Sequence, residues 1–303
     1  MNTQAVAPRF RNGSLVTDTL IIAKRNLLKI LRTPQLLVFS SIQPIMFVLL
    51  FRYVFGGSIQ APGYAGHYAD YLLPGVVIQM TLFGGASTAV GLAEDMSKGI
   101  VDRFRSLPMS RAAVLAGRTI ADLVRSFFVM VLLFGVGYLV GFRFRDGVAH
   151  AIAAILLALL FGFTFSWFFA LIGLTVKDAE SAQVAGFLPI FPLIFAASTF
   201  TPIESMPTWL RAFARANPVT NAANAMRGLS QGHVAVDRFQ AQIAGAKATG
   251  TSFGPANFNV AQTLHSLQQQ ASPGRYVLYT VLWCVGLITL FASLAIRRYR
   301  LGE

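Results

Sequence analysis

Six long apolar stretches alternate with short polar segments along this sequence, and none of the six contains Asp, Glu, Lys or Arg. They are residues 36–51, 71–93, 126–142, 151–176, 181–203 and 276–296. A helix needs about 20 apolar residues to cross a hydrocarbon core of about 30 Å, and an ionised residue at its centre costs about 2.5–3.5 kcal/mol. With the shorter stretches extended by adjoining residues, the pattern predicts an all-α integral membrane protein with transmembrane helices at about 36–55, 71–93, 121–142, 150–176, 181–201 and 276–296.

The distribution of charge predicts how these helices are oriented. The chain is 55% hydrophobic and only 12% charged, yet its formal net charge is +13. Lys and Arg gather before the first stretch, between the second and third, and after the last, whereas the opposite short loops hold only Arg52, Arg143 and Arg145. Because basic short loops stay in the cytoplasm, we expect a multi-pass cell-membrane protein with both termini cytoplasmic. Residues 1–14 then form a flexible cytoplasmic tail, and the long loop at 202–275 lies outside. The positive charge indicates membrane lipids rather than nucleic acid as a partner.

A different kind of helix is predicted at residues 15–33, just before the first span. Its apolar side chains recur at spacings of three, four and seven residues, and basic side chains follow the other side, among them Arg25, Lys29 and Arg32. Thr33-Pro34 ends the pattern. A basic amphipathic helix beside a span is expected to lie flat in the cytoplasmic interface. The pattern does not separate a simple membrane anchor from a helix with a further role.

The loop between the second and third spans predicts a short amphipathic helix at about 99–107. Ile100, Val101, Phe104 and Leu107 share one face, with Asp102 and Arg103 outside it, and Pro108 ends the helix. The membrane surface or a groove on a cytoplasmic partner could cover this apolar face. Further on, Arg118, Asp122 and Arg125 follow at i, i+4 and i+7, so the aspartate is expected to pair with either arginine.

Polar and aromatic side chains within the spans are the candidates for a substrate pathway. Gln43, Gln79 and Thr81 place polar groups at depth, where such groups face the bundle interior as helix contacts or as pathway lining; helix contacts are favoured modestly. Phe187, Phe191 and Phe195 stand one turn apart on the fifth span. They could form an aromatic wall for a planar lipophilic substrate, although packing or lipid contact is the commoner role of such a stripe.

Taken in order, these motifs resemble the membrane subunit of an ABC-2-type ABC transporter, in particular the drug-resistance permeases of daunorubicin and doxorubicin efflux. Glu94, Gly99 and Pro108 match the acidic residue, glycine and proline that surround the coupling helix of that family. Its motif after the fifth span is matched by Pro202, Pro207, Trp209, Asn217, Pro218 and Arg227. The resemblance runs from about residue 17 to the C-terminus. It departs at a polar Gly/Ala/Gln-rich insertion, residues 231–272.

The resemblance implies a function and partners. Residues 15–33 would be the elbow helix, 34–299 the membrane domain, and 99–107 a coupling helix that docks on a separate ATPase subunit; short re-entrant helices would follow the fifth span outside. The sequence has no G-x-x-x-x-G-K-[ST] string, so ATP and magnesium are expected on the ATPase and no cofactor on this chain. Two permeases, either two copies or two paralogues, would assemble with two ATPases.

The implied cargo is a lipophilic drug or antibiotic that is exported. Export of a lipid or a lipid-linked polysaccharide, and a non-transporting membrane scaffold, remain alternatives. An enzyme is disfavoured because the four histidines are isolated in the sequence, no metal-ligand spacing occurs, and Cys284 lies within an apolar span.

Overall fold

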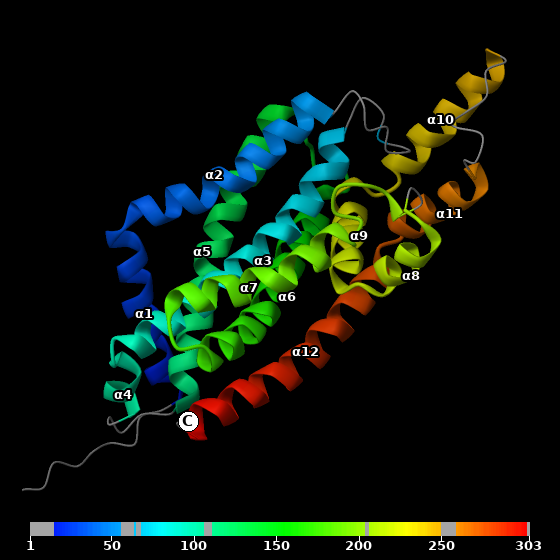
Figure 1. The fold of residues 1–303 in the computed structure, drawn as a ribbon. Helices are drawn as coiled ribbons and strands as arrows, with labels where there is room; N and C mark the ends of the chain where they lie inside the picture. Colours follow the sequence, from blue (N-terminus) through cyan, green and yellow to red (C-terminus); the bar gives the residue numbers. More distant parts are fainter. Residues whose placement is uncertain are drawn as a thin grey trace, which may run out of the picture.

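The computed structural model describes residues 15–55, 64, 68–105, 111–203, 206–249 and 259–301, and these residues form helices and connecting loops without a strand (Figure 1). The predicted tail at 1–14, Leu107 and Pro108 lie outside the described residues. The helices are α1 Leu15–Arg32, α2 Pro34–Leu50, the π-helical turn η1 Phe51–Phe55, α3 Tyr68–Ser97, α4 Ile100–Arg105, α5 Arg111–Val140, α6 Gly147–Thr175, α7 Ala179–Phe195, α8 Thr208–Ala216, α9 Pro218–Gln231, α10 Val234–Ala248, α11 Val260–Ala271 and α12 Gly274–Leu301.

Four of the described helices are long and apolar enough to cross a membrane: Tyr68–Ser97, Ala112–Val140, Gly147–Thr175 and Gly274–Tyr299. Two shorter apolar helices, Ser41–Val54 and Ala179–Phe195, fall in the first and fifth predicted spans. Helix α5, which contains the third predicted span, begins at Arg111, ten residues before the predicted start of that span at 121. Helix α7 ends at Phe195 rather than at 201, because residues 196–200 form turns whose backbone carbonyls bond elsewhere in the chain.

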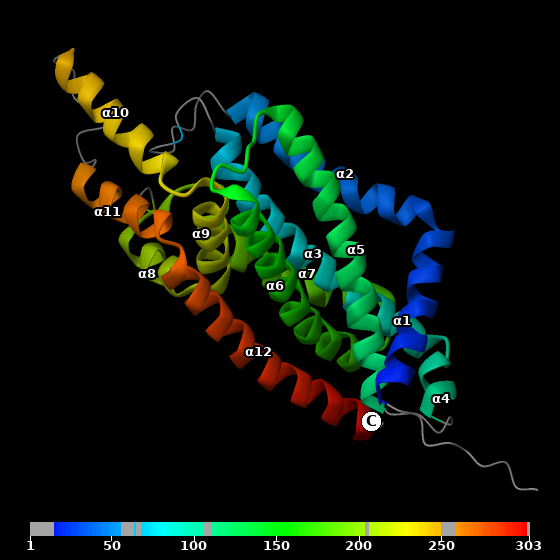
Figure 2. The same cartoon turned by 180° about the vertical axis from the view of Figure 1, so that it is seen from behind.

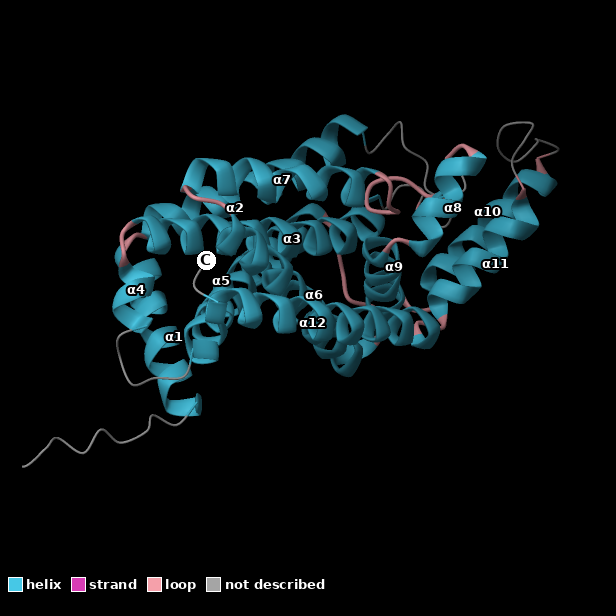
Figure 3. Cartoon of the chain, turned by 60° about the horizontal axis from the view of Figure 1, so that its bottom comes forward, coloured by secondary structure: helices cyan, strands magenta, loops and turns pink. Residues whose placement is uncertain are grey.

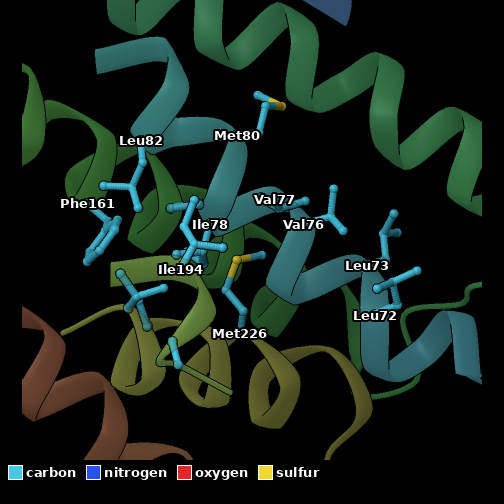
Figure 4. Packing of buried hydrophobic residues seen from close by; sticks show 14 of the residues in the cluster. Leu72, Leu73, Val76, Val77, Ile78, Met80, Leu82, Phe161, Ile194 and Met226 are labelled. Atoms are coloured by element: carbon cyan, nitrogen blue, oxygen red, sulfur yellow. The ribbon is translucent and has the colours of Figure 1, made fainter. Parts of the chain in front are cut away.

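Helix α3 is the centre of the bundle. It packs against α6, α7, α9 and α5, while α12 runs along the outside (Figures 1 and 2). Its side chains Leu72, Ile78 and Leu82 are fully buried and belong to the main apolar core, together with Phe161 of α6 and Ile194 of α7 (Figure 4). A helix buried on all sides needs apolar side chains around its whole circumference, which explains why the sequence of α3 has no strongly polar face.

Helix α1 runs across the direction of the long helices and packs against α5 (Figures 1 and 2). The face that it buries is mixed, with Thr19, Ile22 and Asn26 pointing inward, whereas Val16 and Leu20 of the predicted apolar stripe are exposed. Only part of the stripe is therefore exposed, because Ala23 further along it is buried, and the inward face combines polar with apolar side chains.

The two ends of the bundle carry different elements. Figure 3 shows α1 and α4 at one end and α8, α10 and α11 at the other. The end with α4 also carries the C-terminal end of α12 (Figure 1). We call these the α4 end and the α11 end.

Candidate functional site

A cavity of about 150 Å³ lies between α2, α3, α5 and α7. Three of the six predicted pathway residues, Gln43, Gln79 and Phe187, line it together with Phe83 and Arg125. The structure thus brings together residues that are more than 140 positions apart in the sequence. We call this space the inner cavity.

Gln79 gives the inner cavity its specific chemistry. Its side chain is 5% exposed, and its amide oxygen Oε1 is buried without a hydrogen-bond partner among the described residues. Beside it, the rings of Phe83 and Phe187 lie 5.5 Å apart in a tilted arrangement. A buried carbonyl without a partner costs about 1–3 kcal/mol, and a ligand that donates a hydrogen bond would recover that cost. The arrangement suits an apolar ligand that carries an N–H or O–H group.

The remaining pathway candidates lie elsewhere. The Thr81 hydroxyl is buried and donates to the carbonyl of Ile78 in its own helix, at 2.7 Å, and the residue does not belong to the lining of the inner cavity. Phe191 and Phe195 stack with their ring centroids 6.1 Å apart, and both are more than half exposed. The phenylalanine stripe of α7 is therefore divided: Phe187 faces the inner cavity, and the other two face away from the chain.

A network of charged side chains runs from the wall of the inner cavity to the α4 end. Asp122 lies 3.8 Å from Arg118 and 3.6 Å from Arg125, which confirms the pairing predicted from their spacing. It also accepts a hydrogen bond of 2.7 Å from the hydroxyl of Thr88 on α3. Arg125 in turn donates to the carbonyl of Gly84, at 2.9 Å, and to the Ser87 hydroxyl, both in the cavity wall.

Asp95 extends this network to α1, and sequence reasoning missed it. It is 5% exposed and lies 3.0 Å from Arg118 and 3.5 Å from Arg25. Its neighbour Glu94, which the family motif pointed to, is more exposed and pairs with Lys98 and, at 3.7 Å, with Lys29. The available signal was the position of Asp95 just two residues after the predicted span 71–93, where a carboxylate that the bundle buries needs a charged partner.

The described part of the predicted coupling helix, α4, is turned partly inward. Gly99 has φ +66°, a left-handed conformation that glycine adopts without strain, and it turns the chain from α3 into α4. Val101 is 2% exposed in a core with Leu115 and Trp167. Phe104 packs against the same core and lies under the Arg25 guanidinium, 4.8 Å from its carbon to the ring centroid. The chain itself therefore covers much of the apolar face that we expected a partner to cover.

The outward side of α4 differs from the face predicted to dock. Ile100, which belongs to the predicted face, is only partly buried, and Arg103, which lies outside that face, is exposed. Asp102 is the residue between Val101 and Arg103 in the same helix. A protein that contacts α4 would therefore meet Ile100, Arg103 and the exposed Lys98 before it.

The motif after the fifth span joins α7 to α9. Asn217 caps α9 through its side-chain oxygen, 2.9 Å from the amide of Val219, and its amide group donates to the carbonyls of Leu193 and Ala196 at the end of α7. Pro218 occupies the first turn of α9, where its missing N–H costs nothing. Pro207 precedes α8, Pro202 lies in the loop before it, and Trp209 on α8 is 76% exposed.

Arg227 of α9 is fully buried and lies at the centre of the α11 end of the bundle. Its guanidinium donates to the carbonyls of Tyr71, Ser198 and Thr199, at 2.9 Å to Tyr71 and 3.0 Å to Thr199. It donates further to Asn224 Oδ1, at 2.9 Å, and lies 3.8 Å above the ring of Tyr71. Two of these acceptors, the carbonyls of Ser198 and Thr199, lie in the turns after α7, and the Tyr71 carbonyl lies near the start of α3. The side chain therefore fixes the ends of α3 and α7 to α9.

Asp70 forms a second buried polar centre nearby, which sequence reasoning also missed. It is 1% exposed, lies 3.2 Å from Arg238 of α10 and 3.7 Å from Arg145, and accepts the amide of Arg143. The insertion after residue 231 is thus tied to the start of α3 by an ion pair.

The bundle of apolar helices, four of which are long and apolar enough to cross a membrane, is the architecture of a multi-pass membrane protein. Comparison with known proteins gives the family. The ABC-2 type transporter model matches residues 17–229. A daunorubicin resistance ABC transporter permease of Streptomyces coeruleorubidus is 33% identical over 220 residues, 73% of this chain and 77% of the relative.

Two further relatives agree. A probable doxorubicin resistance ABC transporter permease of Mycobacterium tuberculosis is 26% identical over 72% of this chain and 78% of its own length. A putative transport permease of Cyanophora paradoxa is 23% identical over 71% and 74%. The chain therefore belongs to the ABC-2 type transporter family, as its motifs predicted.

Proposed function

We propose that this chain is the permease subunit of an ATP-driven exporter in the plasma membrane, with six spans and both termini in the cytoplasm. Helix α2 with η1, and α7, supply the two shorter spans. Two features support this orientation: the elements predicted inside, α1 and α4, lie at one end of the bundle, and α8, α10 and α11 lie at the other. Helix α9, buried throughout Val219–Gln231, is the best candidate for a re-entrant helix. The turns that follow α7 accept hydrogen bonds from Tyr71 and Arg227, which would meet the requirement that non-helical backbone within a membrane has protein partners.

The cargo that we propose is a lipophilic drug or antibiotic, and the inner cavity is the observation that carries this proposal. Its walls are largely apolar and aromatic, with one buried carbonyl, that of Gln79, left for a ligand. The relatives named as daunorubicin and doxorubicin resistance permeases favour the same class of cargo. Entry from the membrane is short, since Gln43 on α2 is exposed and lines the cavity at the same time.

A second permease copy or paralogue completes this site in our proposal. The inner cavity measures about 150 Å³, whereas pockets for drug-sized ligands measure about 300–1,000 Å³. Next to it, Phe191 and Phe195 on α7 and Met46 on α2 are exposed, each by more than half. Two such surfaces facing each other would enlarge the cavity and cover these side chains.

A separate ABC ATPase supplies the energy, because the sequence holds no P-loop. We place its docking surface on the outward side of α4, at Ile100 and Arg103. From there a continuous chain of contacts leads through Phe104, Arg25, Asp95, Arg118 and Asp122 to Arg125 in the cavity wall. Such a chain supports a coupling route, and only a functional measurement establishes one.

The test is ATP-dependent dye uptake into inside-out vesicles that contain the chain and its cognate ATPase. We expect Gln79→Leu to lower the transport of lipophilic dyes bearing an N–H or O–H group by up to about tenfold, the value of one buried hydrogen bond. Thermal stability should not fall, because the substitution removes an unpartnered carbonyl. The control is Gln35→Leu on α2, which makes the same substitution at an exposed position outside the cavity lining.

Three outcomes would count against the proposal. Equal transport by the Gln79→Leu variant would remove the inner cavity from the pathway. Movement of labelled lipids but not of dyes would favour lipid export. Vesicles that accumulate nothing from a broad dye and lipid panel, although the ATPase is bound, would favour a scaffold.

A further inference from the structure

A second and larger cavity, of about 790 Å³, lies at the α11 end of the bundle. Its walls come from α8, α9, α11, the start of α12 and the N-terminal end of α3. Helix α11 lies beyond residues 17–229, the part of the chain that the family model matches. The insertion thus builds one wall of this space, which we call the outer cavity. Its volume falls in the range of about 300–1,000 Å³ that is usual for ligand pockets.

The lining of the outer cavity combines aromatic rings with planar hydrogen-bonding groups. Tyr276, Tyr279 and Trp283 of α12 supply the rings, and Asn224, Gln262 and Gln269 are among the side-chain amides opposite. The amide oxygen of Gln270, also in the lining, is buried without a partner among the described residues. An amide can donate and accept at once, so a ligand with many groups that do both would use this surface best.

The charge of the lining is one-sided. Arg215 and Arg275 contribute two positive charges, and no Asp or Glu belongs to the described lining. Tyr64 lines the cavity as a neutral phenol, since burial raises its pKa to about 12. A cationic ligand would therefore meet repulsion without a counter-charge, whereas hydroxyl, carboxylate and phosphate groups would find donors.

From this combination we propose that the outer cavity binds a glycosyl group, neutral or anionic. Sugar rings present apolar C–H faces to aromatic side chains and hydroxyls to amides, and the volume accommodates more than one ring. The floor of the cavity is formed by Tyr71, Ser198 and Asn224, three of the residues that hold Arg227. A bound sugar would touch the polar centre that joins α3, α7 and α9. The site is distinct from the inner cavity and goes beyond the proposed drug transport.

The test is calorimetric titration of the whole chain in lipid nanodiscs with three trisaccharides: maltotriose, which is neutral, a galacturonic acid trimer, which is anionic, and a fully deacetylated chitosan trimer, which is cationic. We expect the first two to bind and the third to bind at least tenfold more weakly. Gln269→Ala should weaken maltotriose binding about fivefold, as the loss of one hydrogen bond does. Gln268→Ala, an exposed neighbour on the same helix that does not line the cavity, should have no effect.

Arg275→Gln adds a charge-specific readout, because removing one of the two positive charges in the lining should weaken binding of the anionic trimer more than binding of the neutral trimer. If Gln269→Ala fails to fold, as judged by size-exclusion profile, Gln262→Ala in the same wall replaces it. The proposal would be overturned if neither the neutral nor the anionic trimer bound the wild-type chain. It would also be overturned if Gln268→Ala weakened maltotriose binding as much as the cavity-lining variant does. Neither result bears on drug transport, since the titration needs no ATPase and leaves the inner cavity unaltered.

Discussion

At the scale of single residues, Arg227 is a fully buried cation surrounded by carbonyl oxygens, an amide oxygen and a ring, and none of the described groups that accept its hydrogen bonds is a carboxylate. An isolated buried charge is costly. Here the dipoles of the surrounding carbonyl and amide groups stabilise the guanidinium. The guanidinium suits this role because its five N–H groups lie in one plane and diverge toward separate acceptors.

Replacement of Arg227 by lysine should therefore destabilise the protein although the charge is retained. An ammonium group has three donors on a single atom and cannot reach the carbonyls of Tyr71, Ser198 and Thr199 together. Each acceptor left unsatisfied costs about 1–3 kcal/mol, so we expect the thermal midpoint of the detergent-solubilised chain to fall by about 5 °C or more. The exposed Arg215→Lys serves as the matched control. Equal midpoints for the two variants would show that the cage of acceptors contributes little.

At the scale of helices, the sequence predicted the members of the bundle better than their ends. Uncharged stretches marked all six apolar helices, since exclusion of charge is a property of the segment itself. The end of α7 at Phe195 and the inward turn of Val101 depend on contacts with α9 and with the core near Trp167, and no local pattern encodes such contacts. For the same reason Gln79 and Phe187 could be named as candidates, but their meeting in one cavity could not.

The packing of α3 against α6 gives a prediction at this scale. A Cβ added at Gly173 would lie 2.6 Å from the carbonyl oxygen and 2.9 Å from the Cα of Ala89, both backbone atoms that cannot move aside. Gly173→Ala should force the two helices apart and cost about 1–3 kcal/mol, as overpacked cores do. Gly286→Ala on α12, where no atom lies within 4 Å, should leave the thermal midpoint unchanged or raise it slightly. A stable Gly173→Ala variant would mean that this helix pair is looser than described.

At the scale of the whole molecule, the exposed surface of the bundle is strongly apolar along its long sides. Helix α12 exposes Leu278, Leu282, Val285 and Leu290, and α7 exposes Phe191. Exposed apolar patches of this size mark lipid contact or a partner surface. The charged side chains gather at the ends instead, in the Asp95–Arg118 network at the α4 end and the Asp70–Arg238 pair at the α11 end. The molecule thus has the apolar middle and polar ends that a bilayer selects.

The proposed arrangement of six spans with cytoplasmic termini would place the two ends of the bundle on opposite sides of the membrane, and cysteine labelling in cells can test this. In a Cys284→Ala background, Ser97→Cys reports on the end of α3 and Ala248→Cys on the end of α10; both positions are exposed. A membrane-impermeant maleimide added to intact cells should label the Ala248→Cys variant and reach the Ser97→Cys variant only after permeabilisation, because an odd number of spans, α5, α6 and α7, separates them. Labelling of both variants in intact cells would contradict the six-span arrangement, and with it the assignment of α4 to the ATPase side.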